Sequence, residues 1–170
     1  SSFSGSGFYY GKGIIDQQAF NPSVAGTGSH TITYKHTLVN GCFDSVASVA
    51  RVAPQPVVAA GTDITILQGG VTRLNGAASG GNNITLAWTP AAGLSNATIP
   101  NPEASPGEDT YYTLTATNDD ACSNSDIVFV RVLKTPLIPN AFSPNGDGIN
   151  DVWQVTYLNS YPGCVVEIFN

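Results

Sequence analysis

Short runs of alternating apolar and polar residues recur along the chain and predict β-strands. The clearest run covers residues 112–117, where Tyr112, Leu114 and Ala116 alternate with threonines. A period of two places one set of side chains on a buried face and the other set on the opposite face. No stretch shows a sustained period near 3.6 residues, so we expect almost no helix. Further strands are predicted at residues 63–67, 71–74, 84–88 and 127–132, with a Gly69-Gly70 turn between the first two and Trp88 as a core anchor.

The chain also matches itself at an offset of 80 positions, which predicts two copies of one domain. We therefore expect residues 1–53 to be the C-terminal part of one repeat, residues 54–135 a complete repeat, and residues 136–170 the opening of a third domain. About seven short strands in about 80 residues are typical of an immunoglobulin-like sandwich. The predicted fold class is all-β, with tandem immunoglobulin-like β-sandwich domains of which the last is truncated. The matching positions are Asn21-Pro22 with Asn101-Pro102, Cys42 with Cys122, and Arg51-Val52 with Arg131-Val132 (101 − 21 = 80).

Composition narrows the classes of partner. The chain has 6 Lys and Arg against 12 Asp and Glu, a net charge of −6 and a pI near 4.5. Nucleic-acid binding needs a basic footprint, which this balance argues against. No apolar run approaches the roughly 20 residues that span a bilayer, so direct membrane insertion is not expected.

A loop near the C-terminus has the most unusual composition. Residues 143–148 read Ser-Pro-Asn-Gly-Asp-Gly. Pro144 lacks an amide donor, the glycines relax the backbone, and Asn145 and Asp147 favour turns. The apolar residues on either side are predicted to tie the loop to a core; they are Phe142, Val152 and Trp153. We expect a loop that holds one shape.

Residues 138–153, followed by Tyr-Pro-Gly-Cys-Val-Val-Glu-Ile-Phe-Asn at 161–170, resemble the gliding-motility-associated C-terminal domain. This is the type B sorting domain of type IX secretion substrates in Bacteroidota, and the resemblance covers residues 136–170. It implies export across the outer membrane to the cell surface, with the type IX translocon and outer-membrane shuttle or attachment proteins as partners. Family members continue further, so we expect the chain to be a piece of a longer protein and the truncated domain to be disordered or partner-bound. The predicted partner-binding residues are Asn140, Phe142, Ser143, Pro144, Asn145, Asp147, Asn150 and Asp151.

The preceding repeats carry a second resemblance. Thr-Pro-Ala-Ala-Gly-Leu-Ser-Asn at 89–96 and Thr-Tyr-Tyr-Thr-Leu-Thr at 110–115 resemble the PKD-like and Ig-like repeats of Bacteroidota surface proteins. This implies a large cell-surface adhesin with gliding or adhesion as its role, in which the repeats are non-catalytic spacers. The alternative is an accessory or carbohydrate-binding region of a secreted polysaccharide-degrading enzyme. A row of exposed aromatics would favour the alternative, and Tyr9, Tyr10 and Tyr111 are the only candidates.

The oxygen-rich loop admits two interpretations. Asn145, Asp147 and Asp151 have a spacing reminiscent of calcium loops, in which alternate side-chain oxygens wrap a hard cation. The pattern lacks an Asp two residues before Asn145 and a distal Glu in register. In the other interpretation, the Asn and Asp side chains bond their own backbone in Asx turns.

The remaining residues that could take part in catalysis or metal binding are expected to be structural. His30 and His36 lie six apart without an acidic or cysteine ligand at metal spacing, and His36 is expected to point inward. Asp119 and Asp120 are predicted to be solvated residues of a hairpin tip. No nucleophile elbow is present, and we expect no enzymatic activity from these residues.

Two further expectations concern modification. The three cysteines, Cys42, Cys122 and Cys164, are expected to be free, partly buried thiols, with an interdomain or intermolecular bridge as the alternative. Asp44-Ser45-Val46 resembles the acceptor sequence of Bacteroidota O-glycosylation, which implies Ser45 as a modification site.

Overall fold

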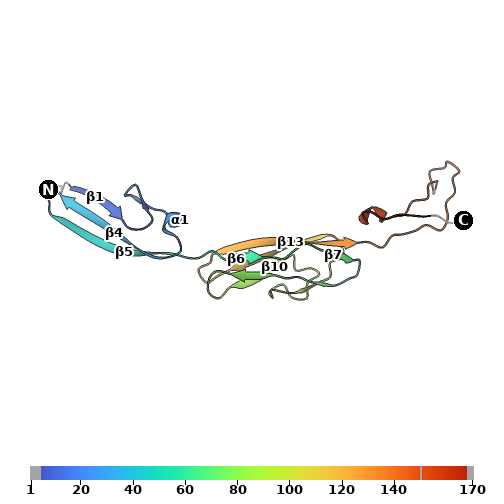
Figure 1. The fold of residues 1–170 in the computed structure, drawn as a ribbon, viewed down its shortest axis with the longest axis horizontal. Helices are drawn as coiled ribbons and strands as arrows, with labels where there is room; N and C mark the ends of the chain where they lie inside the picture. Colours follow the sequence, from blue (N-terminus) through green and yellow to red (C-terminus); the bar gives the residue numbers. More distant parts are fainter. Residues whose placement is uncertain (1–4, 150, 168–170) are drawn as a thin grey trace. The chain divides into compact units, whose positions relative to one another are not determined.

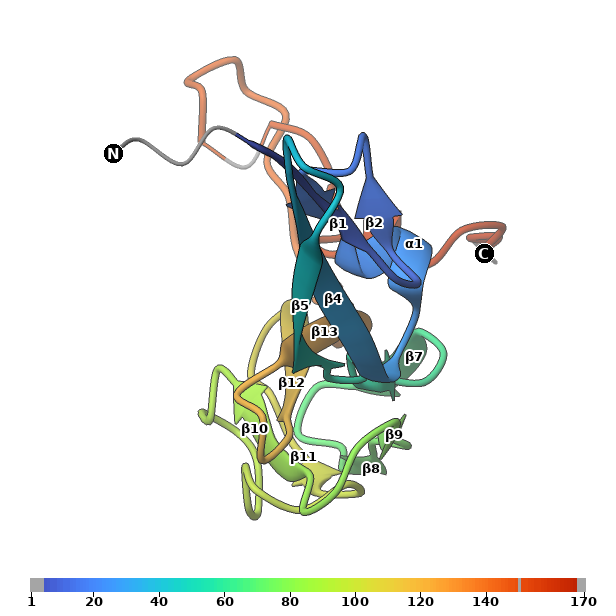
Figure 2. The ribbon, with the colours of Figure 1, turned by 90° about the vertical axis from the view of Figure 1, so that its left-hand side faces the viewer.

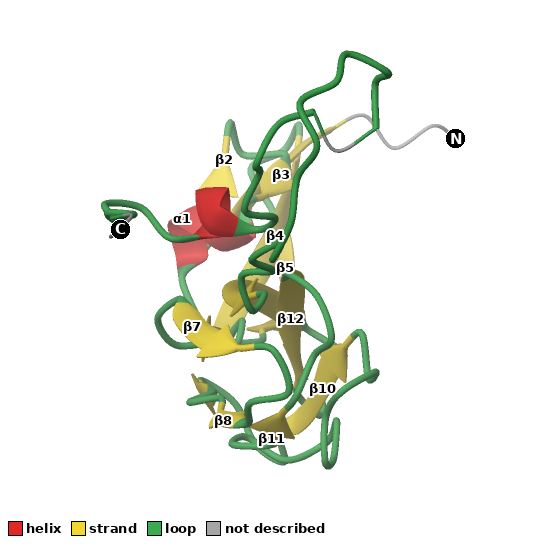
Figure 3. Ribbon diagram, turned by 90° about the vertical axis from the view of Figure 1, so that its right-hand side faces the viewer, coloured by secondary structure: helices red, strands yellow, loops and turns green. Residues whose placement is uncertain are grey.

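The computed structural model describes residues 5–149 and 151–167, and their regular structure is almost entirely β-strand. Helix among the described residues is confined to α1 (Pro22–Ala25) and the 3₁₀ turn η1 (Leu158–Ser160) (Figure 3). Helix α1 is local in origin, because Asn21 caps it by accepting from the amides of Ser23 and Val24 and a proline occupies its first turn. The all-β prediction is confirmed.

The chain divides into two compact units. The first contains residues 1–56 with the short segments 80–84 and 117–123, and the second contains residues 57–79, 85–116 and 124–170. Each unit has its own sheets, which are described separately below.

The first unit is built on a three-stranded antiparallel sheet of β1 (Gly5–Tyr10), β4 (Gly28–Leu38) and β5 (Phe43–Val52), with β4 in the middle (Figure 1). A small hairpin of β2 (Ile14–Ile15) and β3 (Ala19–Phe20) precedes α1. A Cβ at Gly7 in β1 would overlap the side chain of Tyr34 on β4, so a larger residue there would need Tyr34 to shift. Ala25, His30 and Gly13 are buried in this region.

The second unit is built on a four-stranded sheet in the order β10-β12-β13-β7, in which β7 runs parallel to β13. Two short pairs, β6–β9 and β8–β11, complete the structure, and Figure 2 shows β8 and β9 on the side opposite β13. The strands are β6 (Val57–Ala59), β7 (Ile64–Leu67), β8 (Thr72–Arg73), β9 (Ala77–Ser79), β10 (Thr85–Thr89), β11 (Glu103–Ala104), β12 (Thr110–Thr117) and β13 (Ser123–Leu133).

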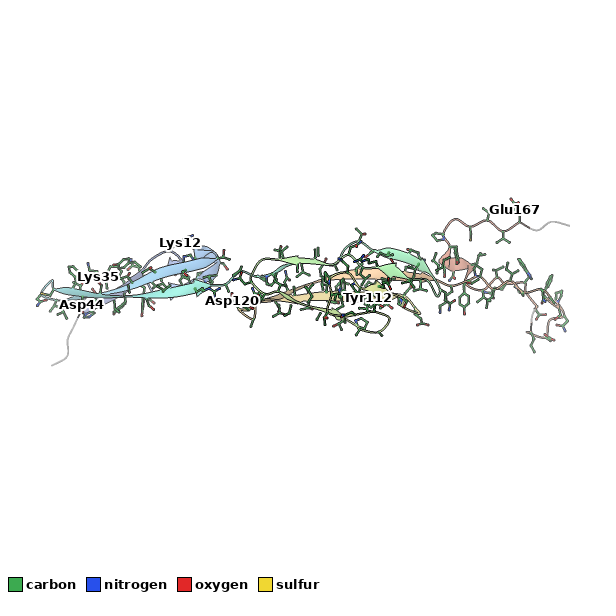
Figure 4. The ribbon with its side chains drawn as sticks, turned by 90° about the horizontal axis from the view of Figure 1, so that it is seen from below. Lys12, Lys35, Asp44, Tyr112, Asp120 and Glu167 are labelled. Atoms are coloured by element: carbon green, nitrogen blue, oxygen red, sulfur yellow. The ribbon has the colours of Figure 1, made fainter. Side chains whose placement is uncertain are left out.

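The core of the second unit lies between these layers. Tyr112, Leu114 and Ala116 on β12 are fully buried, as their alternation predicts, and Trp88 is 2% exposed. Figure 4 labels Tyr112. The indole of Trp88 donates to the carbonyl of Ile99, and the hydroxyl of Tyr112 donates to that of Ala92, so neither polar group is buried without a partner. These side chains come together with Val128, Val130 and Val132 from β13 and with Leu74, which follows β8.

The predicted strands are present with altered ends. The strand expected at 71–74 is only Thr72–Arg73. The amide of Leu74 still donates to the carbonyl of Pro102, in register with the β8–β11 pair, but a proline has no amide to return the bond. The strand expected at 127–132 begins four residues earlier, at Ser123. The Gly69-Gly70 turn forms as predicted, with the amide of Gly70 donating to the carbonyl of Leu67.

Candidate recognition loop

The segment that carries the unusual loop is anchored at its base. Leu137 and Thr156 form an isolated antiparallel bridge, with each amide donating to the other's carbonyl at 3.1 and 3.0 Å. The indole of Trp153 donates to the carbonyl of Pro139 at 2.8 Å. These contacts close a loop of residues 138–155 and fix its two ends.

Asp151 organises the loop from within. Its two carboxylate oxygens accept from the amides of Gly146 and Gly148, both at 2.7 Å. Both glycines have positive φ, +77° and +83°, a region that side chains other than glycine rarely adopt. The glycines therefore favour the backbone that turns the amides of residues 146 and 148 toward one carboxylate.

Asn145 and Asp147 form the neighbouring contacts. The Oδ1 of Asp147 accepts from the amide of Ile149 at 2.8 Å, and its Oδ2 accepts from the side-chain amide of Asn145 at 2.9 Å. The Oδ1 of Asn145 accepts a long bond from the amide of Asp147. Each polar side chain thus bonds a backbone group two residues away, which is the geometry of Asx turns.

These hydrogen bonds shift the acidity of both carboxylates. The amide of Ile149 and the side chain of Asn145 hold the pKa of Asp147 below its ordinary value. The amides of Gly146 and Gly148 lower the pKa of Asp151 in the same way. A carboxylate that accepts backbone hydrogen bonds is favoured in its charged form, so both groups stay ionised at neutral pH.

The loop exposes both polar backbone groups and apolar side chains to solvent. All residues from Asn140 to Ile149 are exposed. An open depression of about 640 Å³ at the base of the loop is lined by Ile138, Ala141, Val152 and the edge of Asp151, among others. The apolar side chains that remain exposed here are Leu137, Ile138, Phe142, Ile149 and Val152.

One prediction about the loop is wrong. Phe142 and Val152 were expected to tie it to a core, but they are 55% and 77% exposed. Only Trp153 is partly buried, and its hydrogen bond to Pro139 supplies the anchor. The loop keeps its shape through side-chain to backbone bonds rather than through burial.

Asn145 and Asp147 have the geometry of Asx turns, whereas Asp151 accepts from amides three and five residues before it. Every carboxylate oxygen of the two acids already accepts an N–H donor. Within residues 5–149 and 151–167, no group of three or more His, Cys, Asp or Glu side chains is arranged to hold a metal ion. Calcium binding stays a hypothesis. Asn150, which was predicted to belong to the partner-binding set, lies outside the described residues.

The other candidate residues do not gather at this loop. His30 is buried, with Nε2 2.8 Å from the carbonyl of Gly26, and His36 is only partly buried on β4. The three cysteines are free, but Cys42 and Cys164 are exposed rather than partly buried. Ser45 is exposed on β5, and its glycosylation stays a prediction.

The acids at the β12–β13 turn have more specific roles than predicted. The hairpin tip is confirmed, but Asp120 forms a two-point ion pair with Arg51, and Asp119 accepts from the side chain of Asn83 at 2.7 Å. Asn118 donates to the carbonyl of Pro54 at 2.8 Å.

The candidate aromatic row does not form. Tyr9 and Tyr10 are successive residues of β1, so their side chains point to opposite faces of the sheet. Tyr111 belongs to the other unit, where it stacks on Phe129 with ring centroids 4.5 Å apart.

Comparison with known proteins bears on the loop directly. Residues 137–170 match the CHU_C type IX secretion signal domain. The matched residues include the whole loop and both strands of its anchoring bridge. The match confirms the resemblance drawn from the sequence, and it indicates export across the outer membrane to the cell surface or the extracellular space. The signal domain also implies interaction with the secretion system.

Structural comparison gives distant likenesses at TM-scores below 0.5. They include extracellular cadherin domains 1–4 of protocadherin gamma B7 (16% identity, TM-score 0.39, 85% of this chain and 45% of that chain covered). The titin domains z1z2 in complex with telethonin are 14% identical (TM-score 0.40, 77% of this chain and 82% of that chain covered). Tandem Ig repeats of Dlar are 17% identical (TM-score 0.37, 77% and 84% covered). Comparison with curated protein sequences gives no match. No helix in the described part of the chain is long and apolar enough to cross a membrane.

Proposed function

We propose that the chain is the non-catalytic C-terminal region of a cell-surface protein of the gliding or adhesion type. In this proposal residues 1–53 and 54–135 are Ig-like spacers, and residues 136–170 open the domain that the type IX machinery recognises. The observation that carries it is the match of residues 137–170 to the type IX secretion signal domain. The β-rich architecture of both units supports the spacer role.

We further propose that the loop of residues 138–155 is the surface that the machinery reads. A recognition surface is most effective when it is ordered before binding, because ordering then costs little on association. The Asp151 and Asp147 bonds hold the backbone in one conformation while Phe142, Ile149 and Val152 stay exposed. Exposed apolar side chains on a rigid polar frame are typical of a protein-binding surface.

The proposal is tested by capture from outer-membrane extract of a cell that carries a type IX system, with the 170-residue chain as bait. One variant replaces residues 145–149 by Gly and Ser. The matched control replaces residues 80–83, an exposed polar loop of equal kind, in the same way. We expect translocon, shuttle or attachment components to be retained by the native chain and the control and lost by the loop variant. Circular dichroism checks that all three are folded.

Equal capture by the loop variant would mean that the loop is structural, and would move recognition to other parts of the matched domain. Capture of no secretion component by any bait would contradict the proposal as a whole. A reporter fused to the same three chains, behind an export signal, measures secretion independently of capture.

A further inference from the structure

Four dipeptides in this chain are able to modify themselves. They are the Asn-Gly pairs at 40–41, 75–76 and 145–146 and the Asp-Gly pair at 147–148. In such pairs the backbone nitrogen of the glycine can attack Cγ of the preceding side chain, because glycine has no side chain to shield that nitrogen. Two of the four pairs follow one another in the loop of residues 138–155.

The reaction needs the glycine amide to be free. The amide gives its proton to a base, a bond forms between its nitrogen and Cγ, and ammonia leaves from Asn, or water from a protonated Asp, each after taking up a proton. Water then opens the succinimide ring at either carbonyl and leaves aspartate or isoaspartate. A glycine N–H that donates a hydrogen bond must first lose that bond, so bonded pairs react more slowly.

In the loop, both attacking nitrogens donate to the same carboxylate. The amide of Gly146 donates to Oδ1 of Asp151 and the amide of Gly148 to its Oδ2, both at 2.7 Å. An amide that lost its proton here would become an anion beside a carboxylate, and like charges at this distance repel. Asp151 therefore opposes the first step of the reaction at both pairs.

The two side chains that would be attacked are engaged as well. The side-chain nitrogen of Asn145, which would leave as ammonia, donates to Oδ2 of Asp147 at 2.9 Å. The amide of Ile149 and the side chain of Asn145 hold the pKa of Asp147 below its ordinary value, so its carboxyl stays ionised. An ionised carboxyl resists attack, because it has no neutral hydroxyl to release as water.

The β4–β5 turn contains the same dipeptide without a carboxylate. Oδ1 of Asn40 accepts from the amide of Cys42 at 3.0 Å, which is again an Asx turn. The amide of Gly41 donates to the neutral carbonyl of Leu38. Asn40 is exposed, as Asn145 is. The chain thus contains an internal reference in which the glycine amide has an uncharged acceptor.

We propose that Asn145-Gly146 and Asp147-Gly148 are latent sites of succinimide formation, and that the carboxylate of Asp151 keeps both unreactive by binding the nitrogens that would attack. Reaction would damage the loop. Deamidation of Asn145 puts a second carboxylate where a donor now faces Asp147, and isoaspartate adds a carbon to the backbone between the two glycines and Asp151. Asp151 thus preserves the covalent structure of the loop as well as its shape.

The test incubates the 170-residue chain and its variants in heavy-oxygen water at neutral pH. Ring opening incorporates heavy oxygen at each converted residue, so peptide mass spectrometry measures both reactions. We expect Asp151→Ala to raise the rates at Asn145 and Asp147 by about ten-fold or more, because hydrogen bonds to charged groups are strong and both are lost. The rate at Asn40 should not change. The native chain in urea gives the unprotected rate, and the folded native chain should react well below it.

Further variants separate the amide bonds from the general order of the loop. Asp151→Asn offers one acceptor oxygen in place of two, so the rate should rise at one of the two sites and stay low at the other. Trp153→Phe removes the anchoring bond to Pro139 and keeps Asp151, so both rates should stay low. Glu167→Gln removes a carboxylate at an exposed position and is the control, with native rates expected.

Three results would overturn the proposal. The first is labelling of Asn145 in the folded native chain that is as fast as in urea. The second is a rate in Asp151→Ala that equals the native rate or falls below it, and a lower rate would make Asp151 a base that promotes attack. The third is equal acceleration by Trp153→Phe, since the order of the loop rather than the Asp151 bonds would then protect both sites.

Discussion

At the scale of single residues, the loop of residues 138–155 keeps its shape without burying its side chains. Asp151 joins two glycine amides and Asp147 joins the amide of Ile149, so three backbone donors depend on two carboxylates. The same bonds lower the pKa of both acids. The order of the loop is therefore linked to pH.

The first prediction follows from this linkage. A carboxyl with a lowered pKa contributes order that is present above its ordinary pKa, near 3.8, and is lost as the pH falls through the lower folded value. We expect the amide resonances of Gly146, Gly148 and Ile149 to be constant from pH 7 to pH 4 and to shift together below that range. NMR titration measures this.

Asp151→Asn should remove one of the two glycine bonds at neutral pH, because an amide offers one oxygen in place of two. Glu167→Gln, at an exposed position, is the control and should leave the three amides unchanged. A titration of Gly146 and Gly148 that is unaltered in the Asp151 variant would contradict the role given to this carboxylate.

At the scale of elements, the β4–β5 turn has a glycine, Gly41, where the equivalent β12–β13 turn has an alanine, Ala121. Gly41 and Ala121 both have positive φ, +84° and +57°. In this region a residue other than glycine is destabilised by about 1–2 kcal/mol. Glycine avoids that cost, but it loses about 0.5–1 kcal/mol of chain entropy on folding. The β12–β13 turn thus carries local strain that the β4–β5 turn avoids.

The second prediction is a matched pair of substitutions at these turns. Ala121→Gly should leave the free energy of unfolding unchanged or raise it by up to about 1 kcal/mol, whereas Gly41→Ala should lower it by about 1 kcal/mol. Urea denaturation of both variants measures the changes. A clear loss of stability in the Ala121 variant would mean that its methyl group makes contacts that outweigh the strain.

The third prediction concerns the ion pair of Arg51 with Asp120. The side chain of Arg51 is 61% exposed and that of Asp120 is 21% exposed, so solvent screens the pair. Arg51→Ala should lower the free energy of unfolding by less than about 1 kcal/mol, and the effect should shrink in high salt. A double-mutant cycle with Asp120→Ala isolates the interaction energy of the pair. A coupling energy that does not change with salt concentration would show that packing rather than charge is responsible.

At the scale of the whole molecule, the buried core belongs almost entirely to one unit. Ten residues form the buried cluster of the second unit, whereas the first unit buries little beyond Ala25 and His30. Stability should therefore be uneven along the chain, with β12 and β13 exchanging their amide hydrogens most slowly.

The fourth prediction tests this division. Leu114→Ala removes a fully buried side chain and should lower the unfolding free energy of the second unit by about 2–5 kcal/mol. Amide exchange in β4 should not change. Ile127→Ala, at a position 56% exposed, is the control and should cost about 0.5 kcal/mol or less. Faster exchange in β4 of the Leu114 variant would show that the two units unfold together.

The sequence by itself determined the local features of this protein. Alternation fixed the buried face of β12, the offset of 80 located the equivalent strands, and the Asn, Asp and Gly spacing of residues 145–151 was sufficient to predict a shaped loop. All of these depend on residues close in sequence or on a repeated pattern, because strand period and turn chemistry are local properties.

Only the tertiary structure decided which distant groups meet. Nothing in the sequence indicated that Phe142 and Val152 would stay exposed or that Asp120 would pair with Arg51. Burial, ion pairing and sheet edges depend on where non-local segments lie, and alternation within a strand is the same whether or not another strand covers its edge.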